Sequence, residues 1–265
     1  MKKILLGAMI ASVALAASAA EVGSANVVGY TKIQLNEGYN MIGVQFSDIG
    51  GAEKSLTSVF TLDETFAGYD DDYKFSNKMR VWDGVKESYA FYGWAGSSGT
   101  DVDDDPTLDN TWTDMEAYAV EGEFFSVGSG AWIITDKSGT LTVSGEVKLE
   151  DVTIDLVAGY NIVCNPFPCE VSITDFGVLD SSFAGYDDDY KFSNKMRVWD
   201  GVKESYAFYG WAGSSGTDID DDPSLDNTWT DMEAYAVDGK IKPGEAVWII
   251  TEKAGTMTFK APKIK

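Results

Sequence analysis

The sequence contains no histidine, and this absence removes several kinds of chemistry at once. Imidazole is the commonest general base in enzymes, a frequent metal ligand and the usual side chain of a physiological-pH switch. Serine or cysteine nucleophiles would lack their histidine base, and no glycine-rich phosphate-binding loop is present. Carboxylates alone can hydrolyse glycosides, but the sequence gives no sign of the isolated acid in an apolar pocket that a general acid needs. We therefore expect a protein that is not an enzyme.

Basic residues are also scarce. Eighteen lysines and two arginines stand against 43 acidic residues, which gives a formal net charge of −23, and the basic residues are scattered. Because such a surface repels phosphates, nucleic acid is not an expected partner. The chain is nevertheless 44% hydrophobic and 13% aromatic, which is too apolar for a disordered protein. Its 265 residues are enough for two domains of ordinary size.

Long hydrophobic runs occur only at the start of the chain. Lys2 and Lys3 precede an apolar stretch at 4–15, and small residues at 17–20 suit cleavage by a signal peptidase. This arrangement predicts a signal peptide at residues 1–20 and export to the extracellular space or cell surface, with the periplasm as the alternative. No other run approaches the ~20 apolar residues that a spanning helix needs, so no transmembrane anchoring is expected.

The chain is a tandem duplication. Residues 66–120 and 183–237 are the same 55-residue block displaced by 117 positions, with only two differences between the copies. The sequences on both sides of the block are also related, although they have diverged. The repeat unit is therefore a whole domain of ordinary size. We expect two β domains: repeat 1, residues 21–147, and repeat 2, residues 148–265.

Short apolar–polar alternations separated by turn residues are typical of β-strands, and they run through both repeats. Residues 78–92 predict a hairpin around an Asp-Gly pair at 83–84. Residues 132–143 predict a second hairpin that closes the repeat, with its turn at 136–139. Helical periodicity is absent after the signal peptide, so short helices are expected only in connections. The predicted fold class is all-β: two tandem small antiparallel β domains, each a sandwich or a partly open barrel.

Five motifs follow one another along the chain: residues 24–30 (Ser-Ala-Asn-Val-Val-Gly-Tyr), 159–168 (Gly-Tyr-Asn-Ile-Val-Cys-Asn-Pro-Phe-Pro), 198–201 (Val-Trp-Asp-Gly), 242–248 (Lys-Pro-Gly-Glu-Ala-Val-Trp) and 255–259 (Gly-Thr-Met-Thr-Phe). Together they resemble signal-bearing, tandem β-domain exported proteins of the verrucomicrobial group. The Asn-Pro-Phe-Pro and Pro-Gly-x-x-x-Trp elements are similar to modules of Bacteroidetes-type exported surface proteins. Repeat 1 departs from the pattern, with Gly-Val-Gln-Phe at 43–46. The resemblance implies an exported surface or matrix component of unspecified activity.

An acidic loop in each repeat is the first candidate site. Carboxylates at alternate positions can converge on a hard cation, because calcium takes 6–8 oxygen ligands in irregular geometry. The spacing resembles the start of an EF-hand loop, but Pro106 replaces the turn glycine and Trp112 stands at the position of the bidentate glutamate. Two interpretations stay open: a calcium loop of another kind, with Ca²⁺ as cofactor, or a solvated loop that keeps the protein soluble. The candidate calcium ligands are Asp101, Asp103, Asp105, Asp109, Asp218, Asp220, Asp222 and Asp226.

Aromatic residues form the second candidate site. All eight tryptophans lie in the repeats, four in each, and an aromatic strand at 89–94 precedes a glycine-rich loop. Flat rings near carboxylates and amides suit a sugar-binding surface, since the apolar face of a sugar stacks on a ring. The other interpretation is that these strand formers fill the core of a small β domain. The candidate ligand-binding residues are Tyr92, Trp94, Tyr209 and Trp211.

The chain has two cysteines, Cys164 and Cys169. In an exported chain they are candidates for a disulfide that closes a short proline-containing loop. Closure of such a loop would add about 2 kcal/mol of stability. The alternative is a pair of reduced thiols, because the short span can hold the two Cα atoms outside disulfide range.

These observations predict an exported, non-enzymatic structural, adhesive or self-assembling protein of the cell surface or extracellular matrix. Its expected partners are further copies of itself, other surface or matrix proteins, or polysaccharide. Duplication supplies two similar surfaces whose weak contacts can act together, and exposed sheet edges can pair with neighbours. The alternative function is that of a calcium-assisted carbohydrate-binding protein.

Overall fold

The computed structural model describes residues 27–69, 74–97, 106–186, 191–214 and 223–263. In this part of the chain the regular elements are all β-strands, and the strand ladders are antiparallel, so the predicted all-β class is confirmed. No helix within these ranges has the length and apolar character needed to cross a membrane. The predicted signal peptide lies outside the described residues.

The strands follow the duplication. Those of repeat 1 are β1 (Val28–Leu35), β2 (Gly38–Gly43), β3 (Phe46–Ser47), β4 (Lys54–Ser55), β5 (Thr61–Leu62), β6 (Lys78–Asp83), β7 (Ser88–Trp94), β8 (Trp112–Thr113), β9 (Phe124–Phe125), β10 (Gly130–Thr135) and β11 (Gly139–Val147). Those of repeat 2 are β12 (Val152–Leu156), β13 (Gly159–Cys164), β14 (Val171–Ser172), β15 (Val178–Leu179), β16 (Lys195–Asp200), β17 (Ser205–Trp211), β18 (Trp229–Thr230), β19 (Lys240–Ile241), β20 (Ala246–Thr251) and β21 (Gly255–Phe259).

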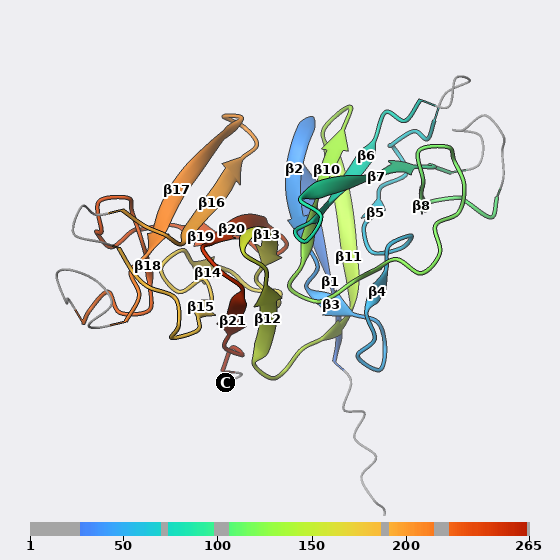
Figure 1. Ribbon diagram of the computed structural model, residues 1–265. Coiled ribbons are helices and arrows are strands. Elements are labelled where there is room, and N and C mark those ends of the chain that lie inside the picture. The colour runs from blue at the N-terminus through green and yellow to red at the C-terminus, as the bar shows by residue number, and fades with distance from the viewer. Residues whose placement is uncertain (1–26, 70–73, 98–105, 187–190, 215–222, 264–265) are drawn as a thin grey trace, which may run out of the picture.

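Each repeat is a two-layer sandwich, and the two repeats stand side by side (Figure 1). In repeat 1 one sheet has the order β1-β11-β3, with β5 also paired to β11, and the other has the order β2-β10-β6-β7-β8. Repeat 2 has the corresponding orders β12-β21-β15 and β13-β20-β16-β17-β18. Both sheets of repeat 1 contribute to one buried cluster, with Leu141 and Val143 from the first and Met79 and Ile133 from the second.

The strands near the two ends of each repeat connect its layers. β1 is followed by β2 and β10 by β11, yet the members of each pair belong to different sheets. The prediction of a hairpin at 132–143 is therefore wrong, because β10 and β11 do not pair with each other. β10 pairs with β2 and β6, while β11 pairs with β1, β3 and β5. The segment is an arch, and its physical reason is the core: Ile133 and Leu141 reach the same buried cluster from opposite sheets.

A buried asparagine clasps the arch between β1 and β2. The Asn40 Oδ1 atom accepts a hydrogen bond from the Asn36 backbone N–H at 2.9 Å, and the Asn40 Nδ2 group donates to the Asn36 carbonyl at 2.9 Å. Nδ2 also donates to carbonyls in its own turn and in β10. In repeat 2, Asn161 makes the same pair of bonds to the backbone of Val157. The Tyr-Asn motif of both repeats is therefore a structural device.

The hairpin predicted around the Asp-Gly pair is confirmed as β6 and β7. The Asp83 carboxylate closes its turn by accepting two backbone N–H groups at 3.0 Å each. The register sets Arg80 opposite Phe91 and Trp82 opposite Tyr89. Because alternate residues of a strand point to the same side, these four side chains share one face of the sheet. That face points away from the core of the sandwich.

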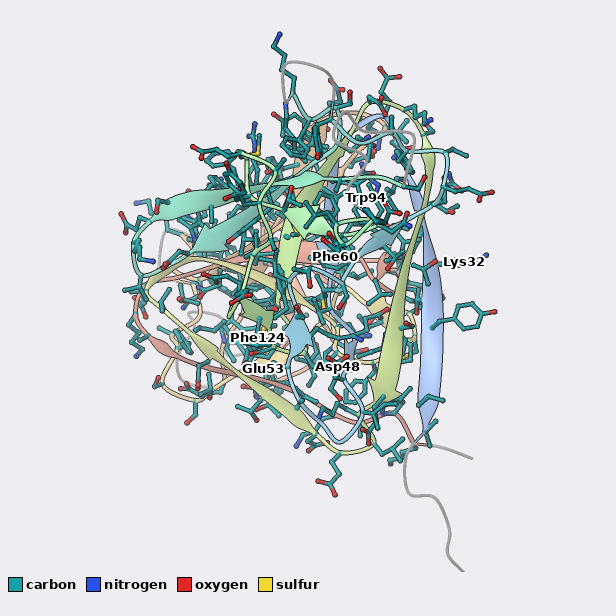
Figure 2. All side chains as sticks on the ribbon, turned by 90° about the vertical axis from the view of Figure 1, so that its right-hand side faces the viewer. Lys32, Asp48, Glu53, Phe60, Trp94 and Phe124 are labelled. Atoms are coloured by element: carbon teal, nitrogen blue, oxygen red, sulfur yellow. The ribbon has the colours of Figure 1, made fainter. Side chains whose placement is uncertain are left out.

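The core of each sandwich is rich in aromatic rings. In repeat 1 the Trp94 ring packs edge-on against Trp112 at 5.2 Å between ring centres, and Phe60 packs against Phe125 at 5.6 Å. The Trp112 indole N–H donates to the Phe60 carbonyl at 2.7 Å, which satisfies that buried donor. Figure 2 shows Trp94 and Phe60 among the ribbon layers, whereas Lys32 projects outward from β1.

Replacing Asn40 by alanine should lower the free energy of unfolding by about 1–3 kcal/mol, because buried backbone groups of the arch lose their partner. Urea unfolding followed by tryptophan fluorescence measures the loss. Asn36→Val is the matched control, since Asn36 gives only backbone groups to the clasp and repeat 2 carries Val157 at this place. Equal stability of Asn40→Ala and the unaltered protein would contradict the clasp.

Candidate functional site

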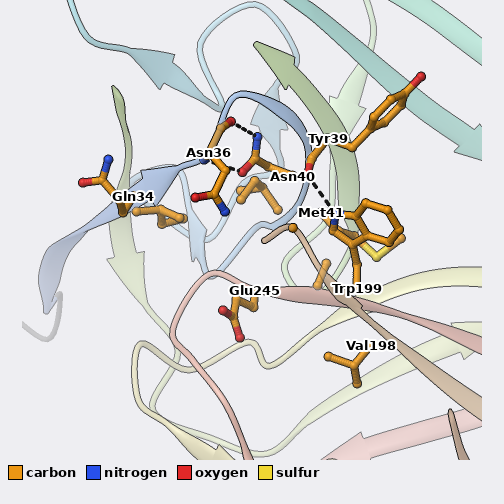
Figure 3. Close-up of a pocket in the computed structure, with 12 residues that line it drawn as sticks. Gln34, Asn36, Tyr39, Asn40, Met41, Val198, Trp199 and Glu245 are labelled. Atoms are coloured by element: carbon orange, nitrogen blue, oxygen red, sulfur yellow. Dashed lines mark hydrogen bonds between the residues drawn. The ribbon is translucent and has the colours of Figure 1, made fainter. Parts of the chain in front are cut away.

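A reciprocal pair of tryptophans joins the two repeats. The Trp82 indole N–H of repeat 1 donates to the Tyr160 backbone carbonyl of repeat 2 at 2.7 Å. The Trp199 indole N–H of repeat 2 donates to the Tyr39 carbonyl of repeat 1 at 2.8 Å, the contact that Figure 3 draws beside Met41. The two tryptophans occupy equivalent places in the repeats, so the same contact is made twice with the roles exchanged. Such mutual use of one surface is the pattern of a two-fold interface.

Backbone hydrogen bonds cross the interface in the same reciprocal way. Gly43 donates to the Gly244 carbonyl at 2.9 Å, and its equivalent Cys164 donates to the Gly128 carbonyl at 2.8 Å. Side chains from both repeats form one buried cluster at this place: Met41, Trp132, Ile162, Cys164, Ala246 and Trp248. The repeats are thus held together by buried contacts, and a surface that spans them has a defined shape.

The close approach of the repeats requires glycine at position 43. A Cβ atom there would overlap the Cβ atom of Cys164 in the other repeat. Repeat 2 carries Cys164 itself at the equivalent position, so the interface accepts a side chain from one repeat only. This constraint accounts for the glycine in the Gly-Val-Gln-Phe segment of repeat 1, where repeat 2 has Cys-Asn-Pro-Phe.

A small cavity lies beside Trp199 at the junction (Figure 3). Residues of both repeats line it, among them Asn36, Asn40 and Glu245, and its volume is about 80 Å³. That space suits a few water molecules and is too small for an organic ligand. The cavity is therefore part of the joint between the repeats.

A larger cleft, which we name the aromatic cleft, opens where the outward faces of the two repeats meet. Its volume is about 260 Å³, close to the ~300 Å³ at the lower end of ligand pockets. Four of its lining residues come from repeat 1 and two from repeat 2: Tyr39, Arg80, Tyr89 and Trp132, with Trp199 and Tyr206. None of these described lining residues is acidic, although the chain has 43 acidic residues.

The rings of the aromatic cleft stand edge to face, which fixes their orientation. Tyr39 packs on Trp132 with ring centres 5.8 Å apart and an interplanar angle of 88°, and Trp132 packs on Trp199 at 5.5 Å and 83°. The equivalent trio of Tyr160, Trp248 and Trp82 has spacings of 5.5 Å and 5.8 Å, both at 85°. The two-fold relation of the repeats therefore produces two matching halves of one aromatic surface.

Each half of this surface holds an arginine between two rings. The Arg80 guanidinium carbon lies 5.4 Å from the ring centres of both Tyr39 and Phe91. Arg197 is held in the same way between the two equivalent rings of repeat 2, at 5.5 Å and 5.4 Å. Cation–π attraction to both rings orients the guanidinium plane. The cleft therefore combines flat apolar faces with a fixed hydrogen-bond donor of positive charge.

Two tyrosine hydroxyls add neutral donors to the cleft. The Trp248 indole N–H donates to the Tyr206 hydroxyl oxygen at 3.3 Å, and Tyr89 occupies the equivalent place in repeat 1. Burial raises the pKa of both phenols, so the hydroxyls stay protonated at neutral pH. Because the Tyr206 oxygen accepts from an indole, its own O–H group can donate to a ligand, and a phenol at Tyr89 also carries an O–H donor.

The aromatic residues predicted to bind a ligand lie in the core instead. Trp94 and Trp211 are each 1% exposed, Tyr92 is buried, and Tyr209 packs against the core of repeat 2. The predicted sugar-binding surface at these four residues is therefore wrong. The cause is the two-residue period of β7, which turns its even-numbered rings inward and its odd-numbered rings outward.

The sequence does carry a signal for the true cleft. The β6–β7 hairpin has apolar residues on both of its faces, with Met79 and Tyr92 on the inner side and Trp82 and Phe91 on the outer side. A sandwich layer normally has one solvated face, so a second aromatic face needs another covering partner. The signal depends on the register, which assigns each residue to a face.

Most of the predicted calcium ligands lie outside the described residues: Asp101, Asp103, Asp105, Asp218, Asp220 and Asp222. The two described members, Asp109 and Asp226, lie at turns and are half-buried. In the ranges that the structure describes, no three potential acidic, cysteine or histidine ligands come together. Binding of calcium by the acidic loops therefore stays a prediction.

Both cysteines are free thiols, so the predicted disulfide is wrong and the alternative, a pair of reduced thiols, agrees with the structure. Cys164 is buried at the interface, where its Sγ atom donates to the Val44 carbonyl of repeat 1 at 3.4 Å. Cys169 lies on the loop of repeat 2, where the Asn165 Nδ2 group donates to its carbonyl at 2.9 Å. The physical reason is that one thiol faces the other repeat while the second belongs to a loop clasped by asparagine. Burial also raises the pKa of the Cys164 thiol.

No protein-family model, no curated protein and no solved structure matches this chain. The rings of the aromatic cleft can stack on a flat apolar face, and its arginine and tyrosine groups can donate hydrogen bonds beside that face.

In the native protein a thiol reagent should label Cys169 alone, because Cys164 is buried and burial raises its pKa. Intact mass after native and denaturing alkylation counts the labels. Gly43→Ala should make Cys164 reactive and cost about 1–3 kcal/mol of stability, since the added methyl group overlaps the cysteine. Labelling that appears only after reduction would instead reveal a disulfide.

Cys164→Gly supplies the control for this interface. In the Gly43→Ala background it removes the overlapping Cβ atom, so the double variant should unfold at a higher urea concentration than Gly43→Ala alone. A double variant less stable than both single variants would show that the overlap is not the cause of the loss.

Calcium titration separates the two interpretations of the acidic loops. A calcium site should raise the midpoint of thermal unfolding in calcium relative to chelator, because a ligand that binds only the folded state stabilises it. Alanine at Asp101 and Asp218 should abolish that rise, while alanine at Asp48, which belongs to neither acidic loop, should leave it unchanged. A midpoint that is the same with calcium and with chelator would assign the loops to solvated surface.

Proposed function

We propose that this protein is an exported, non-enzymatic adhesive component of the cell surface or extracellular matrix that binds polysaccharide in the aromatic cleft. The observation that carries the proposal is the lining of the cleft, where rings from both repeats stand beside an arginine and two tyrosine hydroxyls. A sugar offers an apolar face to such rings and hydroxyl groups to such donors. Export is the expectation from the predicted signal peptide.

The joint between the repeats suits an adhesive role. Rings and donors that are held in place before binding lose little side-chain freedom when a ligand binds. The two-fold relation also presents two matching halves to one extended chain, so that individually weak contacts add. A polysaccharide with many identical units can use both halves at once.

Polysaccharide binding should be visible by isothermal titration and by retardation in gels that contain neutral or acidic polysaccharides. Tyr89→Ala and Tyr206→Ala should each weaken binding about tenfold, because each removes a ring and a donor from the cleft. The matched controls are Tyr118→Ala and Tyr235→Ala, which remove exposed tyrosines of the two repeats outside the cleft lining. Equal losses in both pairs, or no binding to any polysaccharide, would refute the proposal.

A second candidate function, self-assembly, is favoured by one strand. β1 lies at the edge of its described sheet, with Val28 64% and Tyr30 69% exposed. An open edge with exposed apolar residues can pair with a strand of another copy. Lys32 in the same strand acts against such pairing. Size-exclusion chromatography at rising protein concentration, with Tyr30→Lys as the variant that should block growth, tests this candidate.

A further inference from the structure

The two arginines of this chain occupy an unusual electrostatic position. The chain has only two, Arg80 and Arg197, and both stand on the aromatic surface between the repeats. Within the described residues neither forms an ion pair, although acidic residues outnumber basic ones about two to one. The Nε atom of each is buried and has no hydrogen-bond partner in the same described part of the chain. An arginine without a carboxylate partner is well suited to bind one from a ligand.

The surroundings of each arginine limit how a ligand can approach. Rings on both sides cover the two flat faces of the Arg80 guanidinium, at 5.4 Å on each side. Because Nε is buried, the terminal nitrogens are the part of the group that can meet a ligand in the cleft. Two parallel N–H groups at one edge match the two oxygens of a carboxylate. The neighbouring rings lie where a sugar ring that bears this carboxylate can stack.

We infer that the aromatic cleft, together with the equivalent half of the aromatic surface around Arg197, binds an acidic polysaccharide built from hexuronic acid units, whose carboxylates pair with Arg80 and Arg197 while the sugar rings stack on the flanking aromatic residues. The inference rests on the proposed function and adds the class of sugar. Arg80 lines the cleft together with Tyr89 and Tyr206, whereas Arg197 is held outside that lining, between the rings of Tyr160 and Phe208 in the equivalent half of the aromatic surface. We expect one extended chain to pass from the cleft to this second arginine. Two matched half-sites would favour a polymer over a single uronic acid unit.

The large negative charge of the chain does not oppose this local recognition. At physiological ionic strength the Debye length is about 8 Å, so exposed acids farther away are largely screened. The described lining of the cleft contains one guanidinium group, that of Arg80, and no acidic side chain. The same screening predicts that excess salt weakens the carboxylate contact but leaves ring stacking in place. Sulfate esters offer a similar charge and can also pair with a guanidinium edge, so a sulfated polysaccharide is a necessary comparison for the carboxylate.

The test compares ligands that differ only in charge. Polygalacturonate carries one carboxylate on each sugar unit, and its fully methyl-esterified form keeps the same backbone without the charge. Isothermal titration should give the full-length protein at least tenfold higher affinity for polygalacturonate than for the ester. A sulfated neutral polysaccharide forms the third arm, which should bind less tightly than polygalacturonate.

The variants Arg80→Gln and Arg197→Gln test whether the arginines cause the preference for polygalacturonate over its methyl ester. Each variant should lose about tenfold in affinity for polygalacturonate and should bind the methyl ester as the unaltered protein does. Lys86→Gln and Lys203→Gln are the matched controls, because each removes one positive charge from the exposed turn of the same hairpin. Thermal unfolding shows whether each variant is folded. The comparison of polygalacturonate with its methyl ester is made on the unaltered protein, so it tests the inference even if a variant does not fold.

The outcomes separate the inference from the proposed function. Equal affinity for the acid and the ester would overturn the inference and leave polysaccharide binding standing. The inference would also be overturned if both arginine variants still preferred polygalacturonate to the ester, because another group would then bind the carboxylate. Tighter binding of the sulfated polysaccharide would also overturn the inference, because a sulfate and not a carboxylate would then be the recognised group. Failure to bind any neutral or acidic polysaccharide would overturn the proposed function together with the inference.

Discussion

The mutual insertion of Trp82 and Trp199 is the interaction on which the rest of this structure depends. Each indole N–H donates a hydrogen bond to a backbone carbonyl oxygen of the other repeat, with nitrogen–oxygen distances of 2.7 Å and 2.8 Å. Without this exchange, the outward face of each five-stranded sheet would present its tryptophans to water, at a large hydrophobic cost. With it, the two sandwiches share a buried cluster and the remaining rings become the walls of a cleft.

Duplication explains why the joint is reciprocal, and packing explains why it is not perfectly symmetric. A two-fold interface uses each surface twice, so any side chain near the axis meets its own counterpart. Gly43 and Cys164 are such a pair, and space exists for only one side chain between them. Farther from the axis the two repeats keep the two-fold relation. Gly128 leaves space for the side chain of Ile154, and Gly244 leaves the equivalent space for the side chain of Ile33. The positive φ angles of these two glycines, +95° and +81°, also favour glycine there.

Charge is distributed in a way that sets the joint apart from the rest of the surface. The chain is strongly acidic, yet both of its arginines are held at the junction between aromatic rings. Lysine would serve this position less well, since its compact, hydrated ammonium stacks poorly on rings and offers no planar edge. The junction between the repeats therefore has a chemical character different from that of the strongly acidic chain as a whole.

The sequence by itself determined the all-β class, the duplication and the β6–β7 hairpin, because strand alternation and turn chemistry act over a few neighbouring residues. It did not determine that the segment at 132–143 is an arch, since that depends on which distant strands pair with each half. Tertiary structure alone decided the site. Tyr39, Arg80 and Tyr206 are far apart in the chain, and only the docking of two sandwiches brings them to one cleft. The sequence pattern showed which residues are aromatic, but register and docking decided which rings fill a core and which line a surface.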